Sequence, residues 1–248
     1  MLEAVLFDLD DTLLGNSMDV FLPAYFQTLT NYVDQLVPKQ RFMRELMKAT
    51  DAMNARRDGR STNEEAFAAA FYPAVGLDRT RLEPVFEQFY AEEFPRLRSL
   101  TQKRPEARRL VDWARDTGLQ VVVATNPLFP RVAVEQRLEW AGVPVQEFDY
   151  ALVTTYENMH ATKSDVAYYR EILARLDREP DECLMVGDSL NMDIAPAMSI
   201  GIYGYWVTEA ARAPRSGAEL VGVGTLQQLW KRVSAQGSLL PASLGNGT

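Results

Sequence analysis

The chain has 248 residues and a formal net charge of −8, and 47% of its residues are hydrophobic. This length indicates between one and two domains, and the near-average composition excludes a disordered, collagen-like or coiled-coil chain. The acidic balance argues against nucleic acid and anionic membranes as partners, because their phosphates are bound mainly by Lys and Arg. The sequence has no apolar run of about 18 residues and opens without a signal-like segment, so we expect a cytoplasmic protein.

One cysteine and one histidine limit the chemistry that the chain can perform. Cys183 has no partner for an internal disulfide, and a zinc site rich in Cys or His is excluded. His160 belongs to a loop and to no motif, so a structural position is the simpler interpretation.

Short apolar or β-branched runs bounded by turn residues predict buried parallel strands. They occupy residues 4–9, 119–124, 150–153, 183–187 and 202–207. Helical patterns lie between them, from Pro105 to Gly118, from the expected N-cap Ser164 to Leu176, and from Thr225 to Val233. Strands that alternate with helices predict an α/β fold with a doubly wound, Rossmann-like parallel sheet.

The stretch from residue 17 to residue 100 breaks this alternation. It shows only apolar residues at helical spacing, and a crossover between two strands rarely needs about 80 residues. We therefore predict an α/β core domain of residues 1–16 and 101–234 and an inserted helical cap domain of residues 17–100. Residues 15–16 and 101–104 would link them. Residues 235–248 lack any period and are expected to form a flexible tail.

Acidic residues follow the first and the fourth predicted strands. Asp8, Asp10 and Asp11 belong to the segment FDLDDTL, and Asp188 and Asp193 belong to VGDSLNMD. Asp is common in turns and helix caps, so neither segment is specific by itself. Ligands of open α/β sheets bind beyond the carboxyl ends of strands, which is where both segments lie.

Two further segments offer groups that suit an anion. Thr125 and Asn126 end the second strand in VATNP, although an ordinary exit from a strand gives the same pattern. Lys163 precedes the expected N-cap Ser164, where a helix dipole disfavours a cation unless an anion is near. A solvated surface lysine is the alternative.

Taken in chain order, the four segments resemble the motifs of the haloacid dehalogenase superfamily, in its phosphatase branch. The resemblance covers residues 4 to about 207, and the helical stretch after the first motif resembles that family's helical cap. Asp11 stands where many members have glycine, and Pro196 comes early in the helix after the fourth motif; neither departure affects the chemistry. The resemblance implies the strand order 5-4-1-2-3, in which the first and fourth strands are neighbours.

That order would crowd the carboxylates of Asp8, Asp10, Asp188 and Asp193 into one crevice. Two like charges about 4 Å apart repel by roughly 4 kcal/mol at an effective dielectric constant of about 20, and a cation removes this cost. Because only oxygen ligands are available, we expect the cofactor to be Mg²⁺.

The resemblance also implies a role for each motif residue. Asp8 would be the nucleophile that forms an aspartyl phosphate, and Asp10 would protonate the leaving oxygen and then activate water. Thr125 and the backbone amide of Asn126 would hold the phosphoryl oxygens, and Lys163 would neutralise the nucleophile and the phosphoryl charge.

The remaining motif residues would serve the metal. Asp188 would bind Mg²⁺ directly, next to Asp8 and the carbonyl of Asp10. Asp193 would bind through water or orient Lys163. Each of these assignments is carried over from the family.

The cap would select the substrate. Arg56, Arg57 and Arg60 flank Gly59 in a polar loop, and Arg57 and Arg60 are our candidates for binding an anionic leaving group. A solvated basic turn is the alternative.

The sequence therefore predicts a Mg²⁺-dependent phosphatase that acts on a small phosphorylated metabolite. A dehalogenase needs no acid two residues after its nucleophile, so Asp10 favours phosphoryl transfer. A phosphonate hydrolase would need a cap lysine, and neither Lys39 nor Lys48 has a supporting context. A phosphomutase, or a non-catalytic binding protein on the same fold, stays as an alternative, and the oligomeric state is left open.

Overall fold

A parallel sheet of six strands forms the centre of the larger lobe in the computed structural model, which describes residues 1–57, 59–209 and 220–240. The strands are β1 (Ala4–Phe7), β4 (Gln120–Val123), β5 (Leu152–Val153), β6 (Cys183–Gly187), β7 (Tyr203–Val207) and β8 (Leu220–Gly224). They lie in the order β5-β4-β1-β6-β7-β8. The expected order of the first five strands is confirmed. The sequence prediction missed β8, in which two glycines, Gly222 and Gly224, interrupt a short apolar run.

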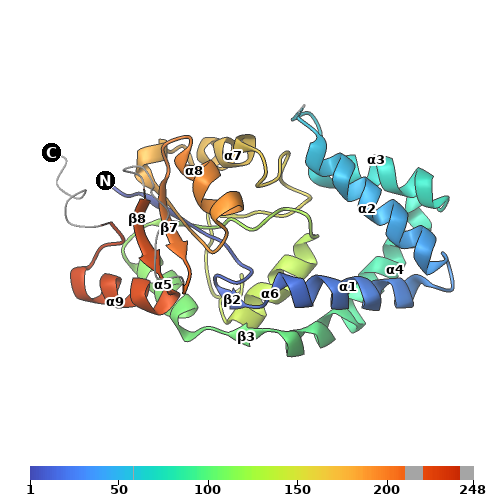
Figure 1. Cartoon of the computed structure of the whole chain (residues 1–248), viewed down its shortest axis with the longest axis horizontal. Helices are drawn as coiled ribbons and strands as arrows, with labels where there is room; N and C mark the ends of the chain where they lie inside the picture. The colour runs from blue at the N-terminus through green and yellow to red at the C-terminus, as the bar shows by residue number, and fades with distance from the viewer. Residues whose placement is uncertain (58, 210–219, 241–248) are drawn as a thin grey trace.

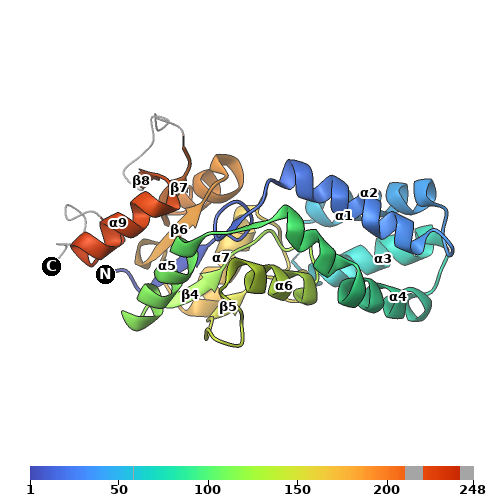
Figure 2. The ribbon, with the colours of Figure 1, turned by 90° about the horizontal axis from the view of Figure 1, so that it is seen from below.

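Helices cover both faces of this sheet, as a doubly wound fold requires (Figures 1 and 2). One face packs against α5 (Pro105–Asp116), α6 (Arg131–Ala141) and α9 (Leu226–Gln236). The other face packs against α7 (Val166–Leu176) and α8 (Ala195–Met198). Every residue of β1 and β6 is buried, so these neighbouring central strands are the apolar runs that a two-sided sheet needs.

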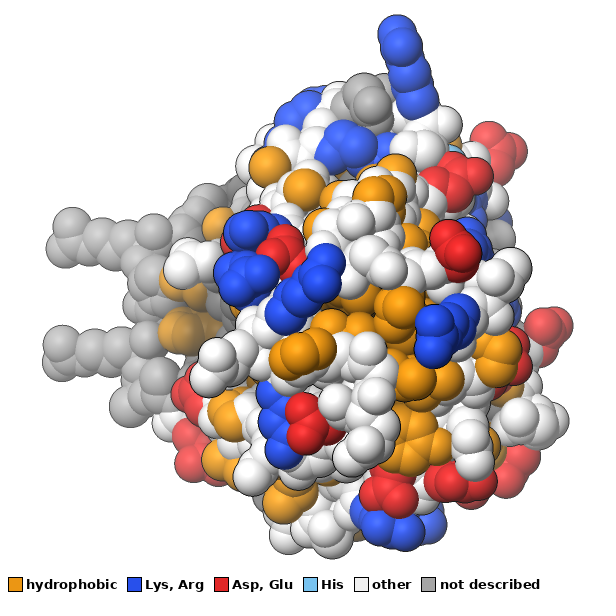
Figure 3. Space-filling view, turned by 90° about the vertical axis from the view of Figure 1, so that its right-hand side faces the viewer, with side chains coloured by type: hydrophobic (Ala, Val, Ile, Leu, Met, Phe, Trp, Pro, Cys, Tyr) orange, Lys and Arg blue, Asp and Glu red, His pale blue; other side chains and the backbone are white. Residues whose placement is uncertain are grey.

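The segment between β1 and β4 is helical, and it forms the lobe at the right of Figure 1. It contains α1 (Met18–Val33), α2 (Lys39–Ala55), α3 (Asn63–Val75), α4 (Arg79–Glu92) and the 3₁₀ helix η1 (Phe94–Leu100). Aromatic side chains join these helices: the ring of Tyr25 lies 6.0 Å from the rings of both Phe89 and Phe94. Figure 3 shows the outer end of this lobe, where hydrophobic side chains lie among charged ones of both signs.

The two segments that connect this lobe to the sheet pair with each other. β2 (Leu14–Gly15) and β3 (Gln102–Lys103) form a two-stranded antiparallel sheet. A Cβ atom at Gly15 would lie 2.9 Å from the carbonyl oxygen of Gln102, so the approach of the two strands requires glycine there. Neither strand was expected, because two residues are too few to give a pattern.

The chain after β8 differs from the expected tail. α9 continues to Gln236, and the side chain of Leu239 is only 1% exposed. Residues 235–237 are exposed, but Leu239 and Leu240 are buried in the main hydrophobic core, so the expected start of the tail at residue 235 does not hold. Residues 241–248 lie outside the described residues.

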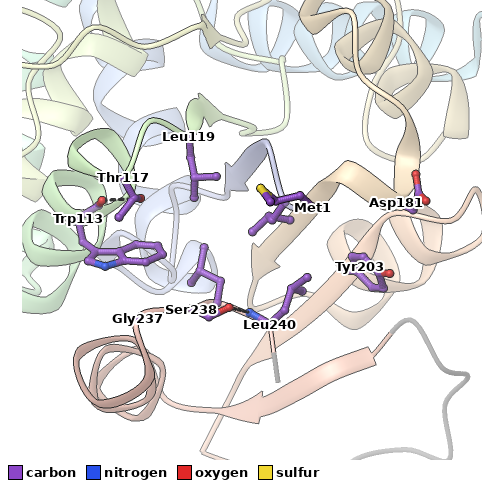
Figure 4. A pocket seen from close by; sticks show the side chains of 11 residues that line it. Met1, Trp113, Thr117, Leu119, Asp181, Tyr203, Gly237, Ser238 and Leu240 are labelled. Carbon is purple, nitrogen blue, oxygen red and sulfur yellow. Dashed lines mark hydrogen bonds between the residues drawn. The ribbon is translucent and has the colours of Figure 1, made fainter. Parts of the chain in front are cut away.

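Leu239 and Leu240 help to line a pocket of about 450 Å³ near the start of the chain. Figure 4 shows Met1, Trp113, Leu119 and Leu240 around it. Leu119 and Tyr203 lie at the amino ends of β4 and β7, so this pocket is at the edge of the sheet opposite the acidic segments. No helix in the described ranges is both long enough and apolar enough to cross a membrane.

Candidate active site

The carboxyl ends of β1, β4 and β6 open into one pocket of about 410 Å³. The N–H of Asp8, directly after β1, donates to the carbonyl of Val186 in β6 at 2.9 Å, so the two acidic segments begin side by side. The structure brings together eight motif residues in this lining: Asp8, Asp10, Asp11, Thr125, Asn126, Lys163, Asp188 and Asp193.

Lys163 is the cation at the base of the pocket. Its side chain is buried, and its Nζ lies 2.5 Å from Oδ1 of Asp8 and 2.5 Å from Oδ1 of Asp193. Burial lowers the pKa of Lys163, but Asp193 and Asp8 outweigh burial and raise the pKa well above its usual value. The alternative of a solvated surface lysine is therefore wrong.

The helix after Lys163 begins one residue later than expected. Oδ1 of Asp165 accepts a hydrogen bond from the N–H of Ala167 at 2.9 Å, which makes Asp165 the N-cap of α7. The hydroxyl of Ser164 is instead hydrogen-bonded to the hydroxyl of Thr162 at 3.0 Å. The prediction of Ser164 as N-cap is wrong, because the turn at Thr162 places Asp165 at the helix start.

Asp193 is held in place by the backbone around it. It lies in the single π turn η3 (Leu190–Ile194), and its Oδ2 accepts a hydrogen bond from the N–H of Ser189 at 2.9 Å. A Cβ atom at Gly187 would overlap the Asp193 carboxylate. Glycine at the end of β6 is therefore needed for this carboxylate to reach Lys163.

The carboxylates of the pocket outnumber the cations that contact them. Burial raises the pKa of Asp8 well above its usual value, Lys163 opposes this, and Asp193 and the other nearby carboxylates add to it. Burial, followed by the charges of Asp193 and Asp11, raises the pKa of Asp188 to about 6. One more cation would relieve both shifts.

Three carboxylates are placed to hold that cation. Asp8, Asp188 and Asp193 each offer one oxygen, and these oxygens lie within 4.8 Å of one another. A set of carboxylate oxygens suits a hard divalent cation such as Mg²⁺ or Ca²⁺ better than a soft metal. The donor set therefore fits a metal ion.

Asp10 has both of its carboxylate oxygens occupied by neighbours that the sequence analysis missed. Oδ1 accepts a hydrogen bond from Nδ2 of Asn16 at 2.9 Å, and Oδ2 accepts one from Nη1 of Arg137 at 2.5 Å. Arg137 is fully buried in α6, with its guanidinium 4.5 Å above the ring of Phe129. The signal in the sequence was an arginine on the apolar face of a helix, three or four positions from Ala133, Val134 and Ala141.

The second motif is fixed by its backbone. The carbonyl of Thr125 accepts hydrogen bonds from the hydroxyls of Thr154 at 2.8 Å and Tyr168 at 2.9 Å. Oδ1 of Asn126 accepts a hydrogen bond from the N–H of Lys163 at 3.2 Å. The loop after β4 is thus tied to the loop that carries Lys163.

The arginines of the cap loop do not reach this pocket. Nε of Arg57 lies 2.7 Å from Oδ2 of Asp165, and Arg56 donates to the carbonyl of His160 at 3.3 Å. Arg56 and Arg57 line a separate pocket of about 330 Å³ between the cap loop and the loop before α7. Arg60 is exposed and is not among the residues that line the acidic pocket. Among the described residues, the geometry gives Arg57 a role in holding the cap to the core.

His160 and the start of α3 belong to the same contact between the cap and the core. Nδ1 of His160 is hydrogen-bonded to Oε1 of Glu171 at 2.8 Å, which agrees with the structural position expected for it. The N–H of Asn63 donates to the carbonyl of Met159, and its Nδ2 donates to the carbonyl of Ala161. The cap therefore contacts the core near Lys163 as well as at the β2–β3 pair.

Comparison with known proteins identifies the class. The model of the haloacid dehalogenase-like hydrolase family matches residues 2–201, so the chain belongs to this family of hydrolases. The chain is also similar to a curated protein, the ribulose-1,5-bisphosphate 5-phosphatase of Halopiger xanaduensis, with 32% identity over 99 residues. That match spans 40% of this chain and 39% of the relative, well under half of its length.

Solved structures show the same fold at low sequence identity. A haloacid dehalogenase-family phosphatase from Thermococcus onnurineus matches with a TM-score of 0.59 and 22% identity, over 96% of this chain and 100% of the other. A 2-haloacid dehalogenase from Pseudomonas syringae pv. Tomato DC3000 matches with a TM-score of 0.60 and 21% identity, over the same shares of the two chains. Because enzymes of two reaction types share the fold, the choice between them depends on the site residues.

Proposed function

We propose that the protein is a Mg²⁺-dependent phosphatase that hydrolyses a small phosphorylated metabolite through an aspartyl phosphate at Asp8. The observation that carries this proposal is a second carboxylate, Asp10, two residues after Asp8 and lining the same pocket. A phosphatase needs such a group to protonate the leaving oxygen and then to activate water, whereas displacement of a halide needs no acid. The phosphatase named among the relatives is consistent with this choice.

The residues of the pocket would divide the reaction between them. An oxygen of Asp8 attacks phosphorus, the bond to the leaving oxygen breaks, and Asp10 gives that oxygen a proton. Water then attacks the aspartyl phosphate while Asp10 takes back a proton, so inorganic phosphate leaves and the Asp8 carboxylate is restored. Lys163 neutralises Asp8 and stays protonated throughout, since two carboxylates contact it.

Asp8, Asp188 and Asp193 would hold the metal ion, for which Mg²⁺ is our assignment. When bound there, Mg²⁺ would supply the positive charge that keeps Asp8 ionised and neutralises the phosphoryl oxygens. Residues 17–100 would act as a cap on a core of residues 1–16 and 101–234. The contacts of this cap at β2–β3 and at Arg57 would position it over the pocket.

The test is hydrolysis of p-nitrophenyl phosphate and of a panel of phosphorylated metabolites. We expect turnover with Mg²⁺, its loss in a chelator, and no turnover by Asp8→Asn. Asp116→Asn, which changes an exposed carboxylate at the end of α5, serves as the control of equal charge. If the wild-type protein is no faster than Asp8→Asn on every phosphate ester, the proposal is wrong. Release of halide from a 2-haloacid without release of phosphate would replace it with the dehalogenase alternative.

A further inference from the structure

The outer part of the active-site pocket is formed by residues that the reaction itself does not use. Met18 and Leu22 come from the first turns of α1, and Leu128 and Phe129 come from the loop after β4. All four belong to or pack against the main hydrophobic core, which fixes their positions. This apolar wall faces the space that remains beyond Asp8, where the leaving group of a substrate must lie.

The rim of the same space is acidic. Asp11 and Asp19 line the pocket in addition to Asp8, Asp10, Asp188 and Asp193. Asp19 lies in the first turn of α1 and makes no ion pair with any residue in the described ranges. Asp11 lies 3.5 Å from Arg104, whose guanidinium also donates to the carbonyl of Asp11 and does not line the pocket.

Among residues 1–57, 59–209 and 220–240, the pocket lining offers no free cation to a second anionic group. In the part of the chain that the structure describes, Lys163 is the one Lys or Arg that lines it, and its Nζ already contacts Asp8 and Asp193. Arg57 and Arg60, which the sequence suggested for an anionic leaving group, belong to the cap loop, where Arg57 pairs with Asp165 instead. An anion beyond the phosphoryl group would therefore meet carboxylates and apolar carbon.

From this lining we infer that the substrate is a phosphate monoester whose leaving alcohol carries no second negative charge and presents an apolar face to α1. The inference rests on the proposed function and narrows it, because bisphosphates and phosphorylated acids would be poor substrates. In this respect the chain would differ from the Halopiger relative, which is named for a bisphosphate. The reaction is otherwise unchanged: water and the ester give the alcohol and inorganic phosphate.

A matched series of esters tests the charge of the leaving group. Propyl phosphate, 3-aminopropyl phosphate and 2-carboxyethyl phosphate have leaving groups of similar length and differ in terminal charge. Each is measured as a substrate, or as a competitive inhibitor of p-nitrophenyl phosphate hydrolysis where turnover is too slow. We expect 2-carboxyethyl phosphate to be at least about fivefold poorer than propyl phosphate in kcat/KM or in inhibition constant, as one like-charge contact in a wet site predicts. The amine should be equal to or better than propyl phosphate.

A substitution in α1 assigns the effect to the rim. Asp19→Asn should reduce the preference for propyl over 2-carboxyethyl phosphate by about fivefold at low salt, and by less at high salt because the side chain is exposed. Asp51→Asn removes a carboxylate from the exposed face of α2 and should leave the preference unchanged. Because each result is a ratio within one variant, a general loss of folded protein does not imitate it.

The outcomes separate this inference from the proposed function. Hydrolysis of p-nitrophenyl phosphate together with equal or better use of 2-carboxyethyl phosphate overturns the inference and leaves the phosphatase standing. An unchanged preference in Asp19→Asn overturns the assignment to α1. A protein that neither hydrolyses nor binds any of the four esters overturns the phosphatase, and the inference with it.

Discussion

Replacing Arg137 with methionine removes the buried cation that holds the carboxylate of Asp10. Methionine keeps an unbranched apolar stem, so contact with the ring of Phe129 is largely retained while the ion pair is lost. The native arginine has no exposed side-chain surface, and the Asp10 side chain is 13% exposed. In the variant, the mostly buried carboxylate of Asp10 therefore keeps only one of these two side-chain hydrogen bonds, the one from Asn16.

The expected loss of stability follows from these contacts. Removing one partner of a buried ion pair costs about 3–5 kcal/mol. Asp10 keeps its bond to Asn16 and some contact with water, so we expect the low end, about 3 kcal/mol in the free energy of unfolding. With an m value of about 3 kcal/mol per M for urea, the unfolding midpoint should fall by about 1 M.

The assay is urea unfolding without added divalent cation, with Arg131→Met as the control on the same helix. Arg131 is 55% exposed and lies 3.8 Å from Glu135, so its loss should cost less than about 1 kcal/mol. A double-mutant cycle with Asp10→Asn should give a coupling energy of at least about 1 kcal/mol. A loss for Arg137→Met no larger than that of the control, or additive single effects in the cycle, would refute the reasoning.

Two other substitutions test the site, and one chemical modification tests the central strand β6. Lys163→Met leaves Asp8 and Asp193 facing each other without a cation. Without metal, the free energy of unfolding of this variant should therefore be about 3–5 kcal/mol lower than that of the wild type, and added Mg²⁺ should raise its Tm by more. Equal Mg²⁺-induced shifts of Tm in the two proteins would contradict this. Gly187→Ala pushes the Asp193 carboxylate aside and should weaken Mg²⁺ binding by roughly tenfold or more in calorimetric titration. Gly118→Ala is the control: there is open space around Gly118, so this variant should lower the stability and leave Mg²⁺ binding unchanged. Burial raises the pKa of Cys183 in β6 to about 12. The native thiol should therefore resist a disulfide reagent at a pH of about 8 and react once urea unfolds the chain. Rapid reaction of the native protein would contradict this and show that β6 becomes exposed without global unfolding.

The central sheet could be predicted from the sequence because its strands are continuous apolar runs. β6 was predicted with its observed ends, since Gly187 and the acids after it mark the turn. The edge strand β8 was missed because Gly222 and Gly224 give it a composition typical of a loop. Leu239 was assigned to a tail because two adjacent leucines after Gly237 form no helical or strand-like pattern from which their burial could be predicted.

The candidate site divides in the same way. Asp8, Asp10 and Asp188 could be placed in one pocket because they follow strand ends, which a parallel sheet gathers at one edge, whereas Lys163 was placed there by the family resemblance. Arg137 could not be assigned to the site, because the helical period places it on an apolar face but does not identify its partner Asp10, which is 127 positions away in the chain. Arg57 was misjudged for the opposite reason: its basic loop is visible in the sequence, while Asp165, which pairs with it, is not adjacent.

The buried cations form ion pairs with some carboxylates of the pocket and not with others, and this determines which carboxylate would gain most from a further positive charge. Lys163 contacts Asp8 and Asp193, and Arg137 contacts Asp10. Asp188 makes no ion pair within the described ranges, and burial together with the charge of Asp193 raises its pKa to about 6. A cation that joins Asp188 to Asp8 and Asp193 would therefore stabilise the carboxylate that has no ion pair within the described ranges, at the edge where the proposed substrate would place its phosphate. With such a cation bound, a chain with a net charge of −8 would be able to bind the proposed phosphate ester without a basic surface.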